Sequence, residues 1–193
     1  MLKKSIALCL GCLLSQAVFA VFPGFYVGAI AGQTYTNYTA SNVGLSSANV
    51  NNTGFGGGAF GGYQFDRNWS VELNFVEFTS TRMTNVNGVS GSTGRISENA
   101  TELFGKGTWP VSDAGFNFTA RAGIAFVKAI SSGALSNQSN SPNMGRFLPA
   151  YSAGVSYDVT PSTPIEISWT QVINGSNIQD ANLFGLSASY YFG

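Results

Sequence analysis

Histidine is absent from the 193 residues of this chain, and cysteine is confined to Cys9 and Cys12. Without an imidazole, no serine–histidine or cysteine–histidine relay can be assembled, which excludes hydrolases of that type. Residues 21–193 also lack the thiolate and imidazole ligands of zinc sites and the cysteines of a disulfide framework. We therefore expect a protein that is not an enzyme, with no catalytic residues, no cofactor and no metal site.

Charge is also scarce in this sequence. Charged residues make up 9% of the chain, whereas a typical soluble domain contains about 25%. The 9 Lys and Arg residues balance the 9 Asp and Glu residues, so the net charge gives no indication of a nucleic-acid or acidic partner. Aromatic residues reach 13%, and there are 24 glycines. Few charges with many aromatic and small residues favour a sheet that has one apolar face and one polar face.

Long hydrophobic runs are missing after the N-terminus, where no segment reaches the roughly 18 consecutive apolar residues of a spanning helix. Residues 1–20 begin with Lys3 and Lys4, continue with an apolar stretch and end on a small-residue cleavage motif. This layout predicts a cleaved Sec signal peptide, which leaves residues 21–193 as one exported domain. An uncleaved anchor and a lipoprotein modified at Cys12 are the alternatives.

What the chain does contain is repeated alternation of apolar and polar residues, which indicates strands with two different faces. In residues 116–126, for example, Phe116 and Phe118 alternate with Asn117 and Thr119. Eight segments follow this rule and are predicted to be strands. They are residues 25–36, 55–65, 69–79, 101–109, 116–126, 147–159, 165–170 and 183–193.

The connections between these segments alternate in length. Short turns are predicted at residues 66–68, 112–115 and 160–163, and the remaining connections are longer and rich in Ser, Asn, Gly and Thr. The long ones are residues 38–54, 80–100 and 131–145, with a shorter one at 174–182. Long loops at one end and tight turns at the other are typical of an outer-membrane barrel. A soluble β-sandwich, the alternative, has no reason to separate them in this way.

Aromatic residues fall on the outward parity and near strand ends, which predicts two girdles around a lipid-facing band. The girdle near the short turns would contain Phe25, Phe65, Trp69, Trp109, Phe116, Tyr157 and Phe192. The other girdle would contain Tyr35, Phe55, Phe75, Phe126, Phe147 and Phe184. The predicted fold is therefore all-β, an eight-stranded antiparallel up-and-down transmembrane β-barrel.

Three short motifs carry a family resemblance that covers residues 22–193. They are Phe-Tyr-Val-Gly-Ala at 25–29, Gly-Tyr-Gln-Phe at 62–65 and the terminal Ser-Tyr-Tyr-Phe at 189–192. With the signal peptide, they resemble the small OmpA-like or opacity-type outer-membrane barrels of Gram-negative bacteria. The resemblance implies localisation in the outer membrane and monomeric barrels.

The same resemblance implies that the last strand is read by the outer-membrane assembly machinery. The residues expected to form this assembly signal are Phe184, Leu186, Tyr190 and Phe192. The chain departs from the pattern because Gly193 follows the final aromatic residue.

Five charged residues have the parity that points into the predicted barrel: Glu72, Glu102, Lys106, Arg121 and Glu166. Buried charges must be paired or neutralised. We therefore expect an interior salt-bridge network that plugs the lumen, since eight strands leave little room for a pore. The alternative role is a gate or an ion path, because charges at membrane depth are functional candidates.

The function expected from these features is a structural or interaction role, as an adhesin or surface antigen, through the long extracellular loops. A narrow channel for small solutes and, less in keeping with the residues, a lipid-modifying enzyme are the alternatives. Expected partners are outer-membrane lipid and lipopolysaccharide, the assembly machinery during biogenesis, and a host or cell-surface ligand at the loops. No nucleic acid is expected.

Overall fold

The computed structural model describes residues 23–112, 114–138 and 140–192. The signal peptide expected at residues 1–20 lies outside these ranges and stays a prediction. Within them, no helix is long and apolar enough to cross a membrane. Nearly all regular structure there is strand, with two single turns of 3-10 helix, η1 (Ser41–Val43) and η2 (Val86–Gly88).

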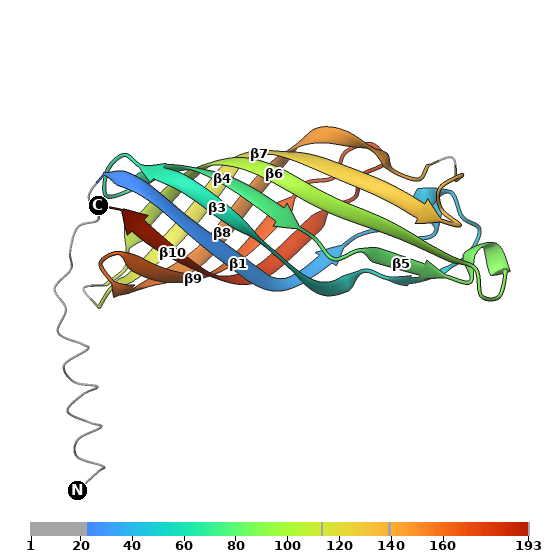
Figure 1. Cartoon of the computed structure of the whole chain (residues 1–193), viewed down its shortest axis with the longest axis horizontal. Coiled ribbons are helices and arrows are strands. Elements are labelled where there is room, and N and C mark those ends of the chain that lie inside the picture. Colours follow the sequence, from blue (N-terminus) through green and yellow to red (C-terminus); the bar gives the residue numbers. More distant parts are fainter. Residues whose placement is uncertain (1–22, 113, 139, 193) are drawn as a thin grey trace, which may run out of the picture.

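Eight long strands of the described chain form a closed antiparallel barrel, as predicted (Figure 1). Each strand pairs with the next one along the chain, and the last pairs with the first to close the ring. The strands are β1 (Gly24–Thr36), β3 (Thr53–Gln64), β4 (Trp69–Glu77), β6 (Thr93–Pro110), β7 (Phe116–Gly133), β8 (Asn143–Thr160), β9 (Thr163–Val172) and β10 (Ala181–Phe192). Two short strands, β2 (Asn49–Asn51) and β5 (Thr81–Thr84), pair with each other and prolong the wall beside β6.

The connections sort by length to the two ends of the barrel (Figure 1). The turns between β3 and β4, between β6 and β7 and between β8 and β9 are short, and we call their side the short-turn end. The connections after β1, β5, β7 and β9 are longer and lie at the opposite side, which we call the long-loop end. This separation is the one that the sequence predicts.

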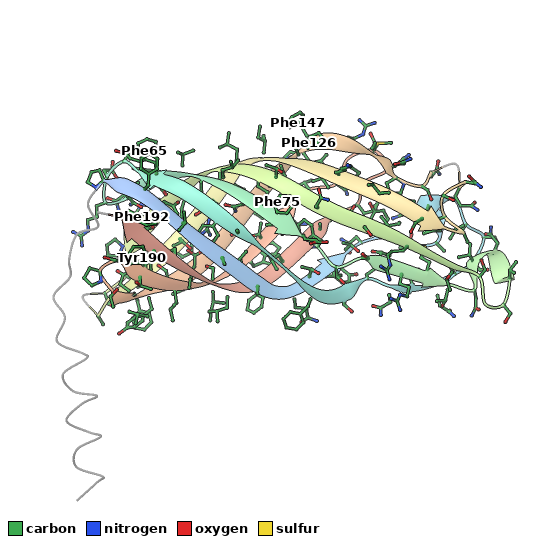
Figure 2. All side chains as sticks on the ribbon, in the orientation of Figure 1. Phe65, Phe75, Phe126, Phe147, Tyr190 and Phe192 are labelled. Atoms are coloured by element: carbon green, nitrogen blue, oxygen red, sulfur yellow. The ribbon has the colours of Figure 1, made fainter. Side chains whose placement is uncertain are left out.

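Side chains alternate between the outside and the lumen along the wall. On β10, Phe184 and Leu186 are 60% and 58% exposed, whereas Leu183 and Ser187 are buried. The labelled aromatic side chains in Figure 2 project outward, Phe192 near the short-turn end and Phe147 further along the barrel. All the aromatic residues predicted for the two girdles are exposed or half-exposed. Their outward placement is confirmed.

The structure contains more strand than the sequence predicts, so three of the predicted loops are partly wrong. The connection expected at residues 38–54 contains β2 and the first two residues of β3. The connection expected at residues 80–100 contains β5 and the first part of β6, and the connection expected at 131–145 loses residues to both β7 and β8. The reason is an inverted pattern. Near the start of β6, Ile96 points inward and is fully buried, while the polar Arg95 and Ser97 point outward. Closer to the short-turn end the outward face is apolar, and the strands predicted from the sequence are those with this apolar outward face.

The inverted pattern builds a second hydrophobic core at the long-loop end, which we call the long-loop core. It consists of Tyr38, Val43, Leu45, Met83, Val86, Ile96 and Leu135. These residues come from β5, β6 and three connections that are far apart in the sequence. The connections at this end are therefore held in place by buried apolar surface.

Truncating a residue of the long-loop core tests whether it stabilises this end. Met83 is fully buried, so we expect Met83→Ala to lower the free energy of unfolding by about 2–5 kcal/mol, the usual result of emptying a core site. Urea unfolding of the refolded protein measures this change. Val89→Ala is the control, because Val89 lies in the connection that follows β5 but is 61% exposed. Equal stability of both variants would show that the long-loop core contributes nothing.

Candidate functional site

Four of the five predicted interior charges meet in the barrel, and we call this group the lumen network. Arg121 donates from Nε to Glu72 Oε1 at 2.9 Å. Its Nη1 and Nη2 donate to the two oxygens of Glu166 at 2.5 and 3.1 Å. Lys106 donates to Glu166 Oε2 at 3.1 Å and lies 3.8 Å from Glu72 Oε2. Two acids and two bases thus balance in a closed, buried group.

Strand register explains why these residues need one another. Lys106 on β6 lies directly opposite Arg121 on β7, and like charges in that position destabilise a sheet. The acids that pair with them come from β4, which is hydrogen-bonded to β6, and from β9. The bidentate contact between Arg121 and Glu166 is the strongest kind of charge-assisted hydrogen bond. The closed barrel makes this pairing possible, since the strands concerned are far apart in sequence.

Glu102 does not join the lumen network, so its predicted place in a salt bridge is wrong. It lies opposite Asn74, whose side-chain nitrogen donates to Glu102 Oε2 at 3.3 Å. Among the described atoms, Glu102 Oε1 and Asn74 Oδ1 have no hydrogen-bond partner. Both residues line a cavity of about 20 Å³, which is about the size of one water molecule. The base within reach, Arg121, already pairs through its guanidinium with Glu72 and Glu166.

The lumen is closed below the network, on the side of the short turns. Tyr26 donates to Glu72 Oε2 at 3.0 Å, and its ring stacks on Tyr191 at 4.6 Å between centroids. Glycine makes this packing possible, because a Cβ at Gly62 would lie 2.4 Å from the Tyr26 ring. Tyr26 is only 1% exposed. No charged group of the network therefore faces open space at this end.

Above the network the lumen is filled by apolar side chains. Phe104, Val127 and Leu183, each at most 1% exposed, belong to one cluster from different strands. Next comes a polar layer in which the Tyr38 hydroxyl donates to Glu98 Oε1. Burial, and then the Glu98 carboxylate, raise the pKa of the Tyr38 phenol above its usual value. The long-loop core lies beyond this layer, so buried side chains occupy successive layers of the described lumen.

The exterior of the long-loop end carries a group of basic residues that sequence analysis did not identify. Arg82 and Arg95 are exposed and lie directly opposite each other on β5 and β6. Lys128, also exposed, follows on the adjacent strand β7. Within the described residues, none of these three takes part in a salt bridge. We call Arg82, Arg95 and Lys128 the basic stripe.

The net charge of the whole chain is zero, so composition gives no indication of this basic stripe. In the described chain, the acids Glu72, Glu98, Glu102 and Glu166 are buried in the barrel, whereas Arg82, Arg95 and Lys128 are exposed. The exposed acid Glu77 lies on the same rung as Lys128, two strands away. The outward parity of Arg82 and Arg95 could have indicated the stripe. That parity can be assigned only when residues 81–84 and 93–100 are known to be strand.

The outer membrane protein beta-barrel domain model matches residues 5–192 of the chain. The chain belongs to this family. It is a protein of the outer membrane, and the long-loop end is its extracellular end, because long loops face outward in such barrels. Among curated protein sequences, no match to the chain is found.

Solved structures of outer-membrane proteins share the fold. OprG from Pseudomonas aeruginosa is 13% identical, with a TM-score of 0.59 over 88% of this chain and 97% of that protein. Neisserial surface protein A is 17% identical, with a TM-score of 0.55 over 88% and 97%. Ail of Yersinia pestis, solved with the heparin analogue sucrose octasulfate, is 15% identical, with a TM-score of 0.53 over 88% and 99%. At these identities the likeness shows the common fold alone.

Other predicted sites can also be placed in this outer-membrane barrel. Phe184, Leu186, Tyr190 and Phe192, the predicted assembly signal, all point outward from β10 and are more than half exposed. Their role in assembly stays a prediction. No group of three or more His, Cys, Asp or Glu side chains that could hold a metal ion occurs among residues 23–112, 114–138 and 140–192.

Removing the central base of the lumen network separates a plug from a gate. Arg121→Ala leaves Glu72 and Glu166 buried with one base between them, and breaking such a pair typically costs about 3–5 kcal/mol. We expect the free energy of unfolding to fall by that amount. Adding Glu72→Gln to Arg121→Ala restores the charge balance and should recover part of the loss.

Conductance across a planar bilayer completes this test. The wild-type barrel should show no steady single-channel current, since its lumen is filled. If Arg121→Ala conducts while its stability is unchanged, the network is a gate and the plug interpretation is wrong.

Proposed function

We propose that this outer-membrane barrel is a surface interaction protein, of the adhesin kind, that binds polyanionic polysaccharide at its extracellular end. The observation that carries the proposal is the basic stripe. Arg82 and Arg95 face each other across two strands without a described acid to pair with. Like charges in such positions weaken a sheet, so a bound anion would relieve a repulsion that the fold retains.

The spacing of the stripe suits a repeating anion. Arg95 on β6 lies opposite Ser132 on β7. Lys128 is also on β7, four residues from Ser132, which corresponds to about 14 Å along the strand. Three cations on adjacent strands can therefore meet successive sulfate or carboxylate groups of one chain. The long-loop core supports this presentation, because Met83 and Ile96, the buried neighbours of Arg82 and Arg95, hold the strands in place.

Two further observations favour an interaction role. Buried side chains occupy successive layers of the described lumen, which speaks against the channel alternative. The missing histidine speaks against a relay enzyme acting on lipids. Ail, which shares the fold, was solved with a sulfated heparin analogue. That structure supports the idea that a barrel with this architecture can bind a sulfated saccharide.

Chromatography on immobilised heparin tests the proposal. We expect the detergent-refolded barrel to bind and to elute with salt, because exposed charges are screened. The variant Arg82→Gln/Arg95→Gln should bind roughly three- to tenfold more weakly, as expected for two exposed charge contacts. Arg67→Gln is the control, since Arg67 is exposed in a short turn at the periplasmic end. Equal weakening by Arg67→Gln, or none by the double variant, would contradict the proposal.

We also propose that the outward aromatic residues of β10 act as the assembly signal. Phe192→Ser should lower the amount of folded barrel in the outer membrane of cells, while refolding of the purified chain stays unchanged. Phe65→Ser is the matched control, because Phe65 is 55% exposed and Phe192 is 56% exposed, both near the short-turn end. Heat-modifiable gel migration measures the folded fraction. Equal loss for both variants would assign Phe192 a structural role only.

A further inference from the structure

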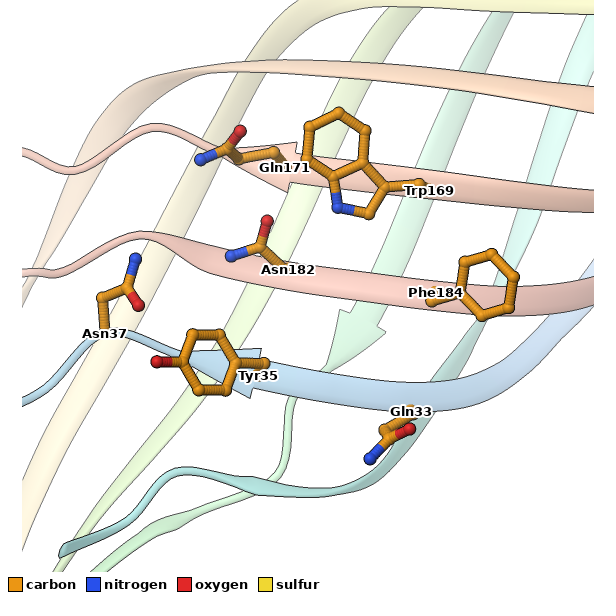
Figure 3. A pocket seen from close by; sticks show the side chains of 7 residues that line it. All are labelled: Gln33, Tyr35, Asn37, Trp169, Gln171, Asn182 and Phe184. Atoms are coloured by element: carbon orange, nitrogen blue, oxygen red, sulfur yellow. The ribbon is translucent and has the colours of Figure 1, made fainter.

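A shallow hollow lies on the outer wall where β1, β9 and β10 approach the extracellular end (Figure 3). Its volume is about 480 Å³. Two rungs of the sheet form it. Tyr35, Asn182 and Gln171 lie side by side on the rung closer to the loops, and Gln33, Phe184 and Trp169 lie on the rung below. We call these six residues the amide–aromatic patch.

The patch begins where the lipid-facing surface ends. The next outward rung towards the short-turn end consists of Ala31, Leu186 and Ile167, which are apolar and exposed. Aromatic residues mark the boundary between hydrocarbon and headgroups in membrane proteins. The amide–aromatic patch therefore lies at the level of the headgroups of the outer leaflet.

The chemistry of the patch is uncharged but rich in hydrogen-bonding groups. Side-chain amides supply donors and acceptors together. In the described structure the amides of Gln33 and Asn182 have no protein hydrogen-bond partner, although both are accessible; the hydrogen bond of Gln171 is with Tyr151 at the side of the hollow. Figure 3 shows the amides of Gln171 and Asn182 towards the loop side and the ring of Trp169 beside them. Flat rings next to free amides match the apolar faces and hydroxyl groups of a sugar.

The charges around the amide–aromatic patch favour a neutral sugar over a phosphate as its ligand. The patch contains no basic residue, and the nearest charged group bonded to its edge is Asp180, which accepts a hydrogen bond from Asn37 at 3.2 Å. A carboxylate there repels phosphate. The basic stripe lies on β5, β6 and β7, which are not among the strands of the patch.

We propose that the amide–aromatic patch binds the neutral sugar headgroup of a glycolipid in the outer leaflet. The lipid source follows from continuity, because the acyl chains of such a molecule would lie against the apolar rung of Leu186 and Ile167. Trp169 and Phe184 stack against the sugar ring, while Gln171 and Asn182 exchange hydrogen bonds with its hydroxyl groups.

The fluorescence of Trp169 can report glycolipid binding at the patch. In the background Trp69→Phe/Trp109→Phe, Trp169 is the only tryptophan left of three. The refolded barrel is placed in phosphatidylcholine vesicles that contain increasing digalactosyldiacylglycerol, a lipid with a neutral sugar headgroup. We expect saturable fluorescence changes with this lipid and none with phosphatidylglycerol. Nuclear Overhauser contacts between sugar protons and the Trp169 indole should appear in the same samples.

The variant Gln171→Ala/Asn182→Ala tests the assigned contacts. Loss of two hydrogen bonds should raise the glycolipid fraction needed for half-saturation by roughly tenfold. Asn99→Ala is the control, because Asn99 is a half-exposed amide on β6, outside the patch. Heat-modifiable migration confirms that each variant is folded.

Several outcomes would overturn the proposal. Phosphatidylglycerol giving the same response would show that the patch does not recognise sugar. Free digalactose saturating the barrel in detergent at equal concentration would show that the lipid part plays no role. An equal loss of glycolipid binding in Asn99→Ala would show that Gln171 and Asn182 are not the sugar contacts. A dimer of the barrel that only the double variant disrupts would show that a second copy of the chain occupies the patch.

Discussion

The structure depends on the pairing of β1 with β10. A membrane offers no water to unpaired backbone groups, so a sheet can cross it only when its two edges meet. The register from Phe25 opposite Phe192 to Thr36 opposite Ala181 provides that closure. Once the ring is closed, each residue is committed to the lipid or to the lumen by its parity, and a shift by one residue would exchange the two sets.

Closure also determines what the interior can contain. Eight strands enclose a space that side chains just fill, so the charged residues on the inner parity are forced together in a dry environment. Lys106 and Arg121 are tolerated as neighbours because Glu72, on the strand beside β6, and Glu166 on β9 pair with them. Tyr26 lies below this buried group and the apolar cluster lies above it.

The surface divides into bands with different solvents. Along β6, Leu103 faces lipid, whereas Arg95 faces water on the same side of the strand. The inward face changes in the opposite sense, from Lys106 to the apolar Ile96. The buried ion pairs thus lie where lipid surrounds the barrel, and the long-loop core lies where water surrounds it. Both proposed binding surfaces lie on the outer face of the barrel, at or above the boundary between lipid and water. The basic stripe is on β5, β6 and β7, and the amide–aromatic patch is on β1, β9 and β10.

The sequence by itself determined the strand number, the barrel class, the sorting of the loops and the outward aromatic residues, because alternation and turn composition are local properties. It also identified the inward parity of Glu72, Lys106, Arg121 and Glu166. Only the tertiary structure decided that Glu102 lies outside the network, since the partners of a buried carboxylate come from strands distant in sequence. The long-loop core and the basic stripe were likewise beyond the sequence, because the face that meets water depends on how far a strand rises above the membrane.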